Sequence, residues 1–138
     1  MTSLAIIPAR GGSKRIPKKN IKEFLGKPII AYSIETAISS GLFDEIMVST
    51  NDNEIAEIAL QYGAKVPFFR SLENSSDVAT TFEVIEEVLF KYKQSGLEFD
   101  FVCCLYPCAP FITNFMLKDA FWKLTNQLFD LVFPITKF

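Results

Sequence analysis

A glycine-rich and strongly basic segment follows the first apolar run of the 138-residue chain. Gly11 and Gly12 stand directly after Arg10, and further basic residues follow before Asn20: Lys14, Arg15, Lys18 and Lys19. Glycine lets the backbone adopt positive φ and lets a ligand approach the main-chain N–H groups closely. N–H groups of this kind, with Arg and Lys around them, bind anions. The segment therefore predicts a phosphate-binding loop, and a solvated basic turn is the alternative.

The spacing of the glycines excludes two common phosphate motifs. Nucleotide hydrolases have four residues between the first glycine and a Gly-Lys-Ser/Thr unit. Dinucleotide-binding proteins carry Gly-x-Gly-x-x-Gly after their first strand. Neither pattern occurs in residues 9–20, so the interpretation rests on charge and on position in the fold.

The charge of the chain is unevenly distributed. Residues 1–27 carry seven basic side chains and one acidic side chain, whereas the remaining 111 residues carry an excess of eight negative charges. An acidic body with one basic loop argues against a general nucleic-acid surface. It favours a small polyanion held at one place.

The chain contains no histidine, which removes Ser-His and Cys-His catalysis and leaves chemistry by positioning and fixed charge. Cys103 and Cys104 are neighbours in an expected strand, so they face opposite sides of it and should not pair. With Cys108 they would need a carboxylate to form a zinc site, and we expect reduced thiols in a cytoplasmic protein instead. No apolar run is long enough for a membrane-spanning helix, and the N-terminus lacks the pattern of a secretory signal.

Short apolar runs alternate with helical patterns along the chain. We expect strands at residues 4–8, 45–50, 65–69, 101–106 and 131–135, and helices at residues 29–39, 54–62, 82–94 and 115–127. Asp52 or Asn53 can cap the second helix and Thr113 or Asn114 the fourth, while Gly63 and Gly96 follow helix ends. This alternation predicts one α/β domain, with helices on both faces of a mostly parallel sheet. In such sheets ligands bind beyond the carboxyl ends of the strands, which is where the basic loop falls.

A longer pattern gives the loop a specific meaning. Residues 8–20 read Pro-Ala-Arg-Gly-Gly-Ser-Lys-Arg-Ile-Pro-Lys-Lys-Asn, and Gly26-Lys27-Pro28 and Tyr32-Ser33-Ile34 follow. Further matches are Val48-Ser49-Thr50-Asn51-Asp52, then Arg70, then Ser76-Asp77-Val78-Ala79-Thr80-Thr81. The whole resembles the cytidylyltransferases that activate nine-carbon acidic sugars, such as CMP-sialic acid synthetases. The segment Tyr106-Pro107-Cys108-Ala109-Pro110-Phe111 looks most like the pseudaminic acid branch.

This resemblance implies a Rossmann-like nucleotidyltransferase, a three-layer sandwich that transfers CMP from CTP to the anomeric hydroxyl of a nonulosonic acid and releases pyrophosphate, with Mg²⁺. It implies that Arg10 and Lys19 act in catalysis and that the nucleotide contacts Ala9, Arg10, Gly11, Gly12, Ser13, Lys19, Asn20, Arg70, Ala79 and Thr81. Tyr106 would contact the sugar, where sialic acid enzymes carry glutamine. Several alternatives remain open: Thr80 or Thr81 as a helix cap, Asp77 as a turn residue, and Tyr106 as core packing.

The chain departs from the family pattern in one respect. The family holds magnesium largely through an Asp-x-Asp pair late in the chain, and no Asp-x-Asp occurs here. We therefore expect residues 1–138 to form a CTP-binding domain without the C-terminal portion of such enzymes, and without metal ligands of its own. The alternatives are a CTP-binding fragment or remnant without turnover, and a sialic acid or ketodeoxyoctonate enzyme. CTP and the sugar acid are the expected partners, and homodimer formation is left open.

Overall fold

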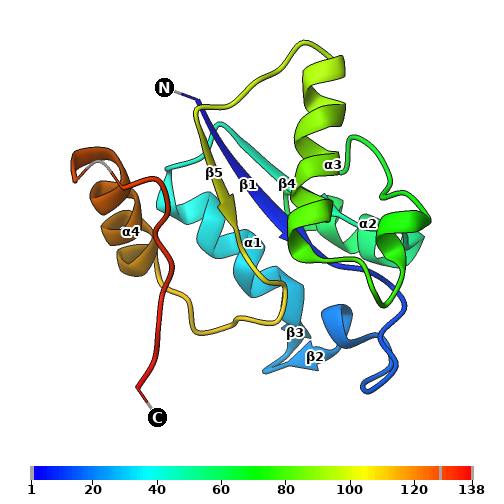
Figure 1. The fold of residues 1–138 in the computed structure, drawn as a ribbon. Coiled ribbons are helices and arrows are strands. Elements are labelled where there is room, and N and C mark those ends of the chain that lie inside the picture. The colour runs from blue at the N-terminus through cyan, green and yellow to red at the C-terminus, as the bar shows by residue number, and fades with distance from the viewer. Residues whose placement is uncertain (1, 128, 138) are drawn as a thin grey trace.

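The central sheet consists of three parallel strands: β1 (Ser3–Pro8) lies between β4 (Glu45–Ser49) and β5 (Phe101–Cys104) (Figure 1). In the register of the sheet, Ile6 pairs with Met47 on one side and with Cys104 on the other. The structure is a computed structural model that describes residues 2–127 and 129–137. The predicted parallel sheet is confirmed at these three strands, although β5 ends at Cys104, two residues before its predicted end.

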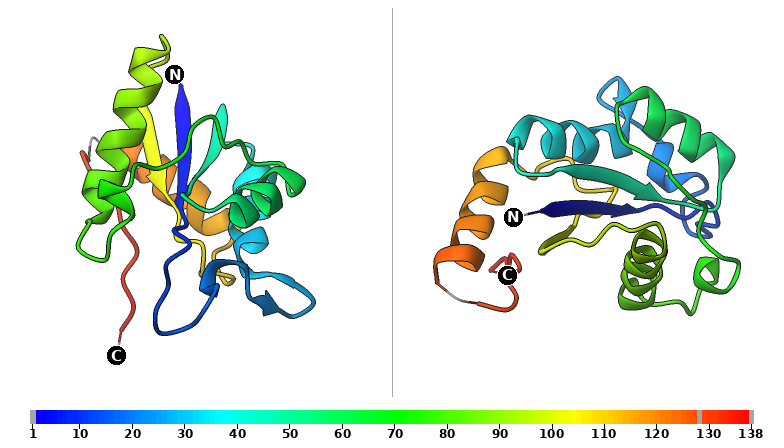
Figure 2. Two further views of the ribbon diagram at one scale, coloured as in Figure 1. Left: turned by 90° about the vertical axis from the view of Figure 1, so that its right-hand side faces the viewer. Right: turned by 90° about the horizontal axis from the view of Figure 1, so that it is seen from above.

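In the part of the chain that the structure describes, four α-helices surround the sheet, each within one residue of its predicted bounds: α1 (Ile29–Ser40), α2 (Asn53–Gln61), α3 (Thr81–Gln94) and α4 (Asn114–Asn126). Figure 2 shows α1 and α2 on one face of the sheet and α3 on the other. α4 packs beside α1, and its Phe121 meets Phe101 of β5 edge to face at 5.4 Å. The described residues thus form the three-layer sandwich that the sequence predicts.

Alternation along β1 divides the core into two parts. Leu4 and Ile6 pack with Met47, Val88 and Tyr92 on the α3 side. Ala5 and Ile7 point the other way, into a cluster with residues of α1, α2 and α4. Successive strand residues face opposite sides of a sheet, so an apolar strand covered on both faces is buried throughout. β1 is therefore fixed rigidly, and the loop that follows it begins from a rigid element.

Side-chain caps fix the helix starts that matter for the loops. Asp52 accepts from the amide of Ile55 at 3.0 Å and begins α2. Thr80 accepts from the amide of Glu83 at 3.2 Å, and the Glu83 carboxylate accepts from the Thr80 amide at 2.7 Å. This reciprocal pair is a capping box. Thr80, and not Thr81, is therefore the cap of α3.

The predicted strand at residues 65–69 is wrong except at its first residue. Lys65 alone bridges to β4, donating to the carbonyl of Ile46 at 2.8 Å and accepting from Val48 at 2.9 Å. Pro67 follows two residues later and has no N–H to donate to a ladder. The segment nevertheless stays alongside β4, because the Arg70 amide donates to the carbonyl of Thr50 at 2.8 Å.

The strand predicted at residues 131–135 is also wrong. Residues 131–137 form neither strand nor helix, and Leu131, Phe133 and Ile135 are largely exposed. An apolar run becomes a strand only where a neighbouring strand satisfies its backbone groups, and Pro134 removes one of the donors. The run therefore follows the surface beside α4 (Figure 1).

A small antiparallel hairpin, β2 (Glu23–Phe24) and β3 (Lys27–Pro28), connects the basic loop to α1. The hydroxyl of Tyr32 on α1 donates to the carbonyl of Phe24 at 2.6 Å and holds the hairpin against the helix. Across the described residues, no helix has the length and apolar character that a membrane crossing requires.

Candidate functional site

Four loops meet at the edge of the sheet where the strands end, at the bottom of Figure 1. They follow β1, β4 and β5, and the fourth leads into α3. Most of the predicted site residues lie on these loops. Because the strands are parallel, their carboxyl ends share one edge, which is where open α/β sheets bind ligands.

The basic loop after β1 is joined to the loop before α3 by a shared carboxylate. Arg10 donates to Oδ1 of Asp77 at 2.7 Å, and Lys14 donates to Oδ2 at 2.5 Å. Hydrogen bonds from Lys14 and then Arg10 lower the pKa of Asp77. Arg10, which the sequence predicts to contact phosphate, and Lys14 are thus both paired with an exposed anion of the chain itself.

Glycine is required at position 11 because a side chain would clash with Asp52, and not because the backbone has a positive φ. A Cβ at this position would lie 2.7 Å from Oδ2 of Asp52, which is too close for any other residue. The Gly11 amide donates to Oδ1 of Asn51 at 3.0 Å. The expectation of positive φ at Gly11 and Gly12 is wrong; in this loop the left-handed residue is Lys18, with φ of 53°. Gly12 has open space around it.

Ala9 and Asn20 are buried and support the basic loop. The Ala9 methyl is buried in the core, and its amide extends the β1–β4 ladder by donating to the carbonyl of Ser49 at 2.8 Å. Asn20 is buried, and its Nδ2 donates to the Arg10 carbonyl at 2.9 Å. Cys108 Sγ lies 3.4 Å from Asn20 Oδ1. In this structure the Asn20 amide supports the main chain of the loop.

Arg70 reaches the same edge from the segment beside β4. Its Nη2 donates to the carbonyl of Ser49 at 2.7 Å and its Nε to the Ser49 hydroxyl at 3.1 Å. The side chain is buried, and burial lowers the pKa of Arg70 to about 10, with Glu87 opposing and the charge of Arg10 adding to the effect. The guanidinium remains charged at neutral pH.

Two predicted contacts with different parts of the substrate lie together. The hydroxyls of Thr81, at the first residue of α3, and Tyr106, after β5, are 3.3 Å apart. Tyr106 is 58% exposed, so it is not core packing, while its carbonyl accepts from Ser33 of α1 at 2.8 Å. Ala79 precedes the cap and is half-buried.

The structure does not join every predicted residue to this group. Ser13 is half-buried and Lys19 is exposed in a short 3-10 turn, η1 (Lys19–Ile21). Within residues 2–127 and 129–137, no hydrogen bond connects either side chain to another predicted site residue.

The residues at this edge do not fit a resident magnesium ion. Asp52 caps α2, and Asp77 is shared by Arg10 and Lys14. In the described part of the chain, no group of three or more His, Cys, Asp or Glu side chains could hold a metal. Magnesium needs oxygen ligands in octahedral geometry, and carboxylates usually supply its protein anchors.

Sequence reasoning gave no role to three residues that the structure connects to the site. Asn51 holds the Gly11 amide, Cys108 contacts Asn20, and Glu87 contacts the turn after Arg70. The signal for Asn51 was its place after a strand end. The signal for Glu87 was its spacing of four residues from Glu83 and from Lys91 on a helix.

Comparison with known proteins places this geometry in a family. Residues 4–137 match the Cytidylyltransferase family. The pseudaminic acid cytidylyltransferase of Campylobacter jejuni is 48% identical over the whole chain, and the CMP-N,N'-diacetyllegionaminic acid synthase of Legionella pneumophila is 45% identical over 99% of it. In each case the match covers 60% of the relative's length, so the chain spans less than two thirds of these proteins.

Solved structures confirm the Rossmann-like nucleotidyltransferase fold. A CMP:2-keto-3-deoxy-manno-octonic acid synthetase complexed with CTP superposes with a TM-score of 0.78 at 23% identity, over 93% of this chain and 49% of its own. A cytidylyltransferase from Leptospira borgpetersenii gives 0.69 at 26% identity, over 92% of this chain and 50% of its own. The sequence match over residues 4–137 and the shared fold lead to one conclusion: the chain belongs to the cytidylyltransferase family.

Proposed function

We propose that this chain is the CTP-binding part of a cytidylyltransferase that transfers CMP to the anomeric hydroxyl of a nonulosonic acid, with pseudaminic acid favoured, and releases pyrophosphate. The observation that carries the proposal is the basic loop held at the carboxyl edge of the sheet, with Arg10 and Lys14 on one carboxylate. The 48% identity to a pseudaminic acid cytidylyltransferase supports the choice of acceptor.

The chemistry follows from charge. Attack of a hydroxyl on the α-phosphate builds negative charge on the phosphate oxygens and on the departing pyrophosphate. Fixed positive charge and positioning account for most of the catalysis in such transfers. Arg10 offers a planar fork for two phosphate oxygens, and Lys19 a point charge on the same loop. The incoming triphosphate replaces Asp77 as the partner of Arg10 and Lys14.

In this proposal Thr81 and Tyr106 contact the two different substrates. Thr81, with the neighbouring Ala79, faces the cytosine, and Tyr106 faces the acceptor sugar. The 3.3 Å distance between the Thr81 and Tyr106 hydroxyls supports the assignment of neighbouring subsites to the base and the sugar. A phenol hydroxyl in place of a glutamine amide disfavours sialic acid as the acceptor.

A second candidate is a CTP-binding module without turnover. It is favoured by the carboxylates at this edge, which do not fit a resident magnesium ion. Pyrophosphate release with CTP, magnesium and a panel of nonulosonic acids separates the two: turnover supports transfer, and binding alone supports the module.

Calorimetric titration with CTP, UTP, ATP and GTP tests CTP binding, which both candidate functions require. CTP should bind tightest, and Arg10→Ala should weaken CTP by roughly ten- to hundred-fold, because it removes a charge-assisted contact. Lys93→Ala removes one positive charge near the far end of α3 and serves as the control. Equal or tighter ATP binding, or parent-like CTP binding by a folded Arg10→Ala chain, would refute the proposal.

A further inference from the structure

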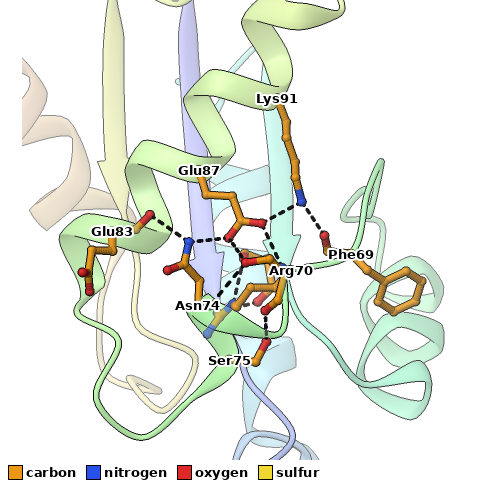
Figure 3. Close-up of polar contacts among 9 residues, drawn as sticks. Phe69, Arg70, Asn74, Ser75, Glu83, Glu87 and Lys91 are labelled. Atoms are coloured by element: carbon orange, nitrogen blue, oxygen red, sulfur yellow. Dashed lines mark hydrogen bonds and ion pairs between the residues drawn. The ribbon is translucent and has the colours of Figure 1, made fainter.

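One side of α3 packs against the turn that follows Arg70, residues 71–75 (Figure 3). Glu83, Glu87 and Lys91 are spaced four residues apart, which places them above one another on a helix. Lys91 Nζ donates to the carbonyl of Phe69 at 2.7 Å and to Glu87 Oε1 at 2.7 Å. Asn74 Nδ2 reaches the carbonyl of Glu83 at 3.5 Å. The helix thus contacts both ends of the turn.

The Glu87 carboxylate lies at the centre of these contacts. Its Oε1 accepts from the Ser71 amide at 2.9 Å, and its Oε2 accepts from Asn74 Nδ2 at 2.7 Å and from the Ser71 hydroxyl at 3.2 Å. Burial alone would raise the pKa of Glu87, but the hydrogen bonds from Lys91, Asn74 and the Ser71 amide outweigh it and hold the pKa at about 2. The group is therefore ionised at neutral pH.

Arg70 fixes the start of the turn through the hydrogen bond of its amide to the Thr50 carbonyl at 2.8 Å, but the residues after it have few other contacts. The turn's only regular structure in the described residues is one 3-10 turn, η2 (Glu73–Ser75), and the Ser75 hydroxyl bonds back to the Ser71 carbonyl at 2.6 Å. Leu72 is 91% exposed and contributes almost no apolar burial. Polar contacts with α3 therefore set where this turn lies.

The turn connects two parts of the candidate site. Arg70 immediately precedes it, with its guanidinium on Ser49, and Asp77 and Ala79 follow it on the way to the cap of α3. A displacement of the turn would strain the bonds from Arg70 to Ser49 at one end and shift Ala79 at the other.

We propose that Glu87 is a positioning residue for the candidate nucleotide site: it holds residues 71–75 against α3 and thereby supports Arg70 on one side and places Ala79 on the other. Glu87 acts through these residues and does not contact the nucleotide. The inference rests on the proposed function for the identity of the ligand.

The test compares Glu87→Gln with Glu86→Gln, its exposed neighbour on the same helix. Both remove one negative charge, but only the first changes the contacts to the turn. CTP and inorganic tripolyphosphate are titrated by calorimetry without denaturant, after urea denaturation has shown that each chain is folded. Glu87→Gln should bind both probes about tenfold more weakly, as expected if the turn keeps its binding arrangement only about a tenth of the time, and Glu86→Gln should match the parent.

A second readout separates positioning from general stability. Hydrogen exchange should become faster at the Ser71 amide in Glu87→Gln and stay unchanged in β1. A Glu87→Gln chain that is less stable but binds both probes like the parent shows a structural role only, and overturns the inference. If that variant does not fold, Asn74→Ala removes the contact from the turn side and should weaken binding in the same direction.

The affinities of the parent for the two probes test the proposed function. The ratio of the variant's affinity to the parent's affinity tests the role of Glu87. A parent that binds tripolyphosphate but not CTP refutes the choice of nucleotide and leaves the ratio measurable. A parent that binds neither probe overturns both statements.

Discussion

Neighbouring threonines at the start of α3 should have separable roles. Thr80 caps the helix through the amide of Glu83, whereas Thr81 points its hydroxyl at Tyr106. Replacing a threonine cap by alanine costs about 1 kcal/mol of unfolding free energy. With a urea m-value of about 2 kcal/mol/M, Thr80→Ala should lower the denaturation midpoint by roughly 0.5 M. CTP affinity of the folded chain should be unchanged.

Thr81→Ala should show the opposite pattern. Alanine is favourable at a helix position, and the lost hydroxyl pair at 3.3 Å is exposed, so the urea midpoint should stay near that of the parent. If the Thr81 hydroxyl contacts the cytosine, losing one neutral hydrogen bond of about 1 kcal/mol weakens CTP binding roughly fivefold. Urea denaturation and calorimetry on the same preparations measure both quantities.

Thr113→Ala is the matched control, because Thr113 caps α4 through the amide of Met116, away from the nucleotide edge. It should lose about as much stability as Thr80→Ala and keep parent affinity for CTP. If Thr80→Ala weakens CTP and Thr81→Ala does not, the assignment of the base contact is reversed. If Thr80→Ala leaves the midpoint unchanged, the capping argument fails.

Further perturbations test the charges at this edge. Asp77→Asn removes the anion shared by Arg10 and Lys14 and should tighten tripolyphosphate binding about two- to five-fold by calorimetry; weaker binding would contradict the exchange of Asp77 for phosphate. The ionised Glu87 carboxylate stabilises the fold fully above its unfolded pKa of 4.5, and this stability is lost as the pH falls through the folded pKa of about 2. Between pH 4.5 and pH 2, the urea midpoint of Glu87→Gln should therefore fall less than that of the parent. Arg70→Lys keeps the charge but loses the two-nitrogen grip on Ser49, and should lower the unfolding free energy by about 1–3 kcal/mol in urea; an unchanged midpoint would show that one ammonium suffices. With CTP, magnesium and pseudaminic acid, this chain should release pyrophosphate far more slowly than a version extended by the C-terminal part of the Campylobacter jejuni relative. The reason is that a misplacement of the metal by about 1 Å can cost on the order of a hundred-fold in rate. Equal rates would show that acids already in the chain bind the metal.

The sequence was sufficient for the order and bounds of the main elements. A short apolar run identified β1, and helical spacing with caps such as Asp52 and Thr113 identified the helices to within one residue. These signals are local, because each depends on neighbours within a few positions. Strand formation at residues 65–69 and 131–135 depends on a partner strand and on available donors, which local patterns do not report.

Contacts within the site were less predictable for the same reason. The loop was found from its glycines and charges, but the reason for Gly11 is the carboxylate of Asp52, 41 positions away. Arg10 and Asp77 are separated by 67 positions, and only the folded sheet edge brings them together. Glu87 carried a helical spacing signal, yet nothing local showed that the turn after Arg70 would lie against that side of α3.

The two carboxylates near the site differ in exposure, and in the proposed function this difference would let the edge stay ordered and still receive a polyanion. The Glu87 side chain is 12% exposed and has donors from both the turn and α3, so replacing it by an external anion would cost several hydrogen bonds at once. The Asp77 side chain is 43% exposed and holds two flexible cations, a contact that water and salt weaken readily. A triphosphate offers Arg10 and Lys14 more negative charge than one carboxylate does. In the proposed function it would therefore displace Asp77 while the turn behind it stays fixed by Glu87.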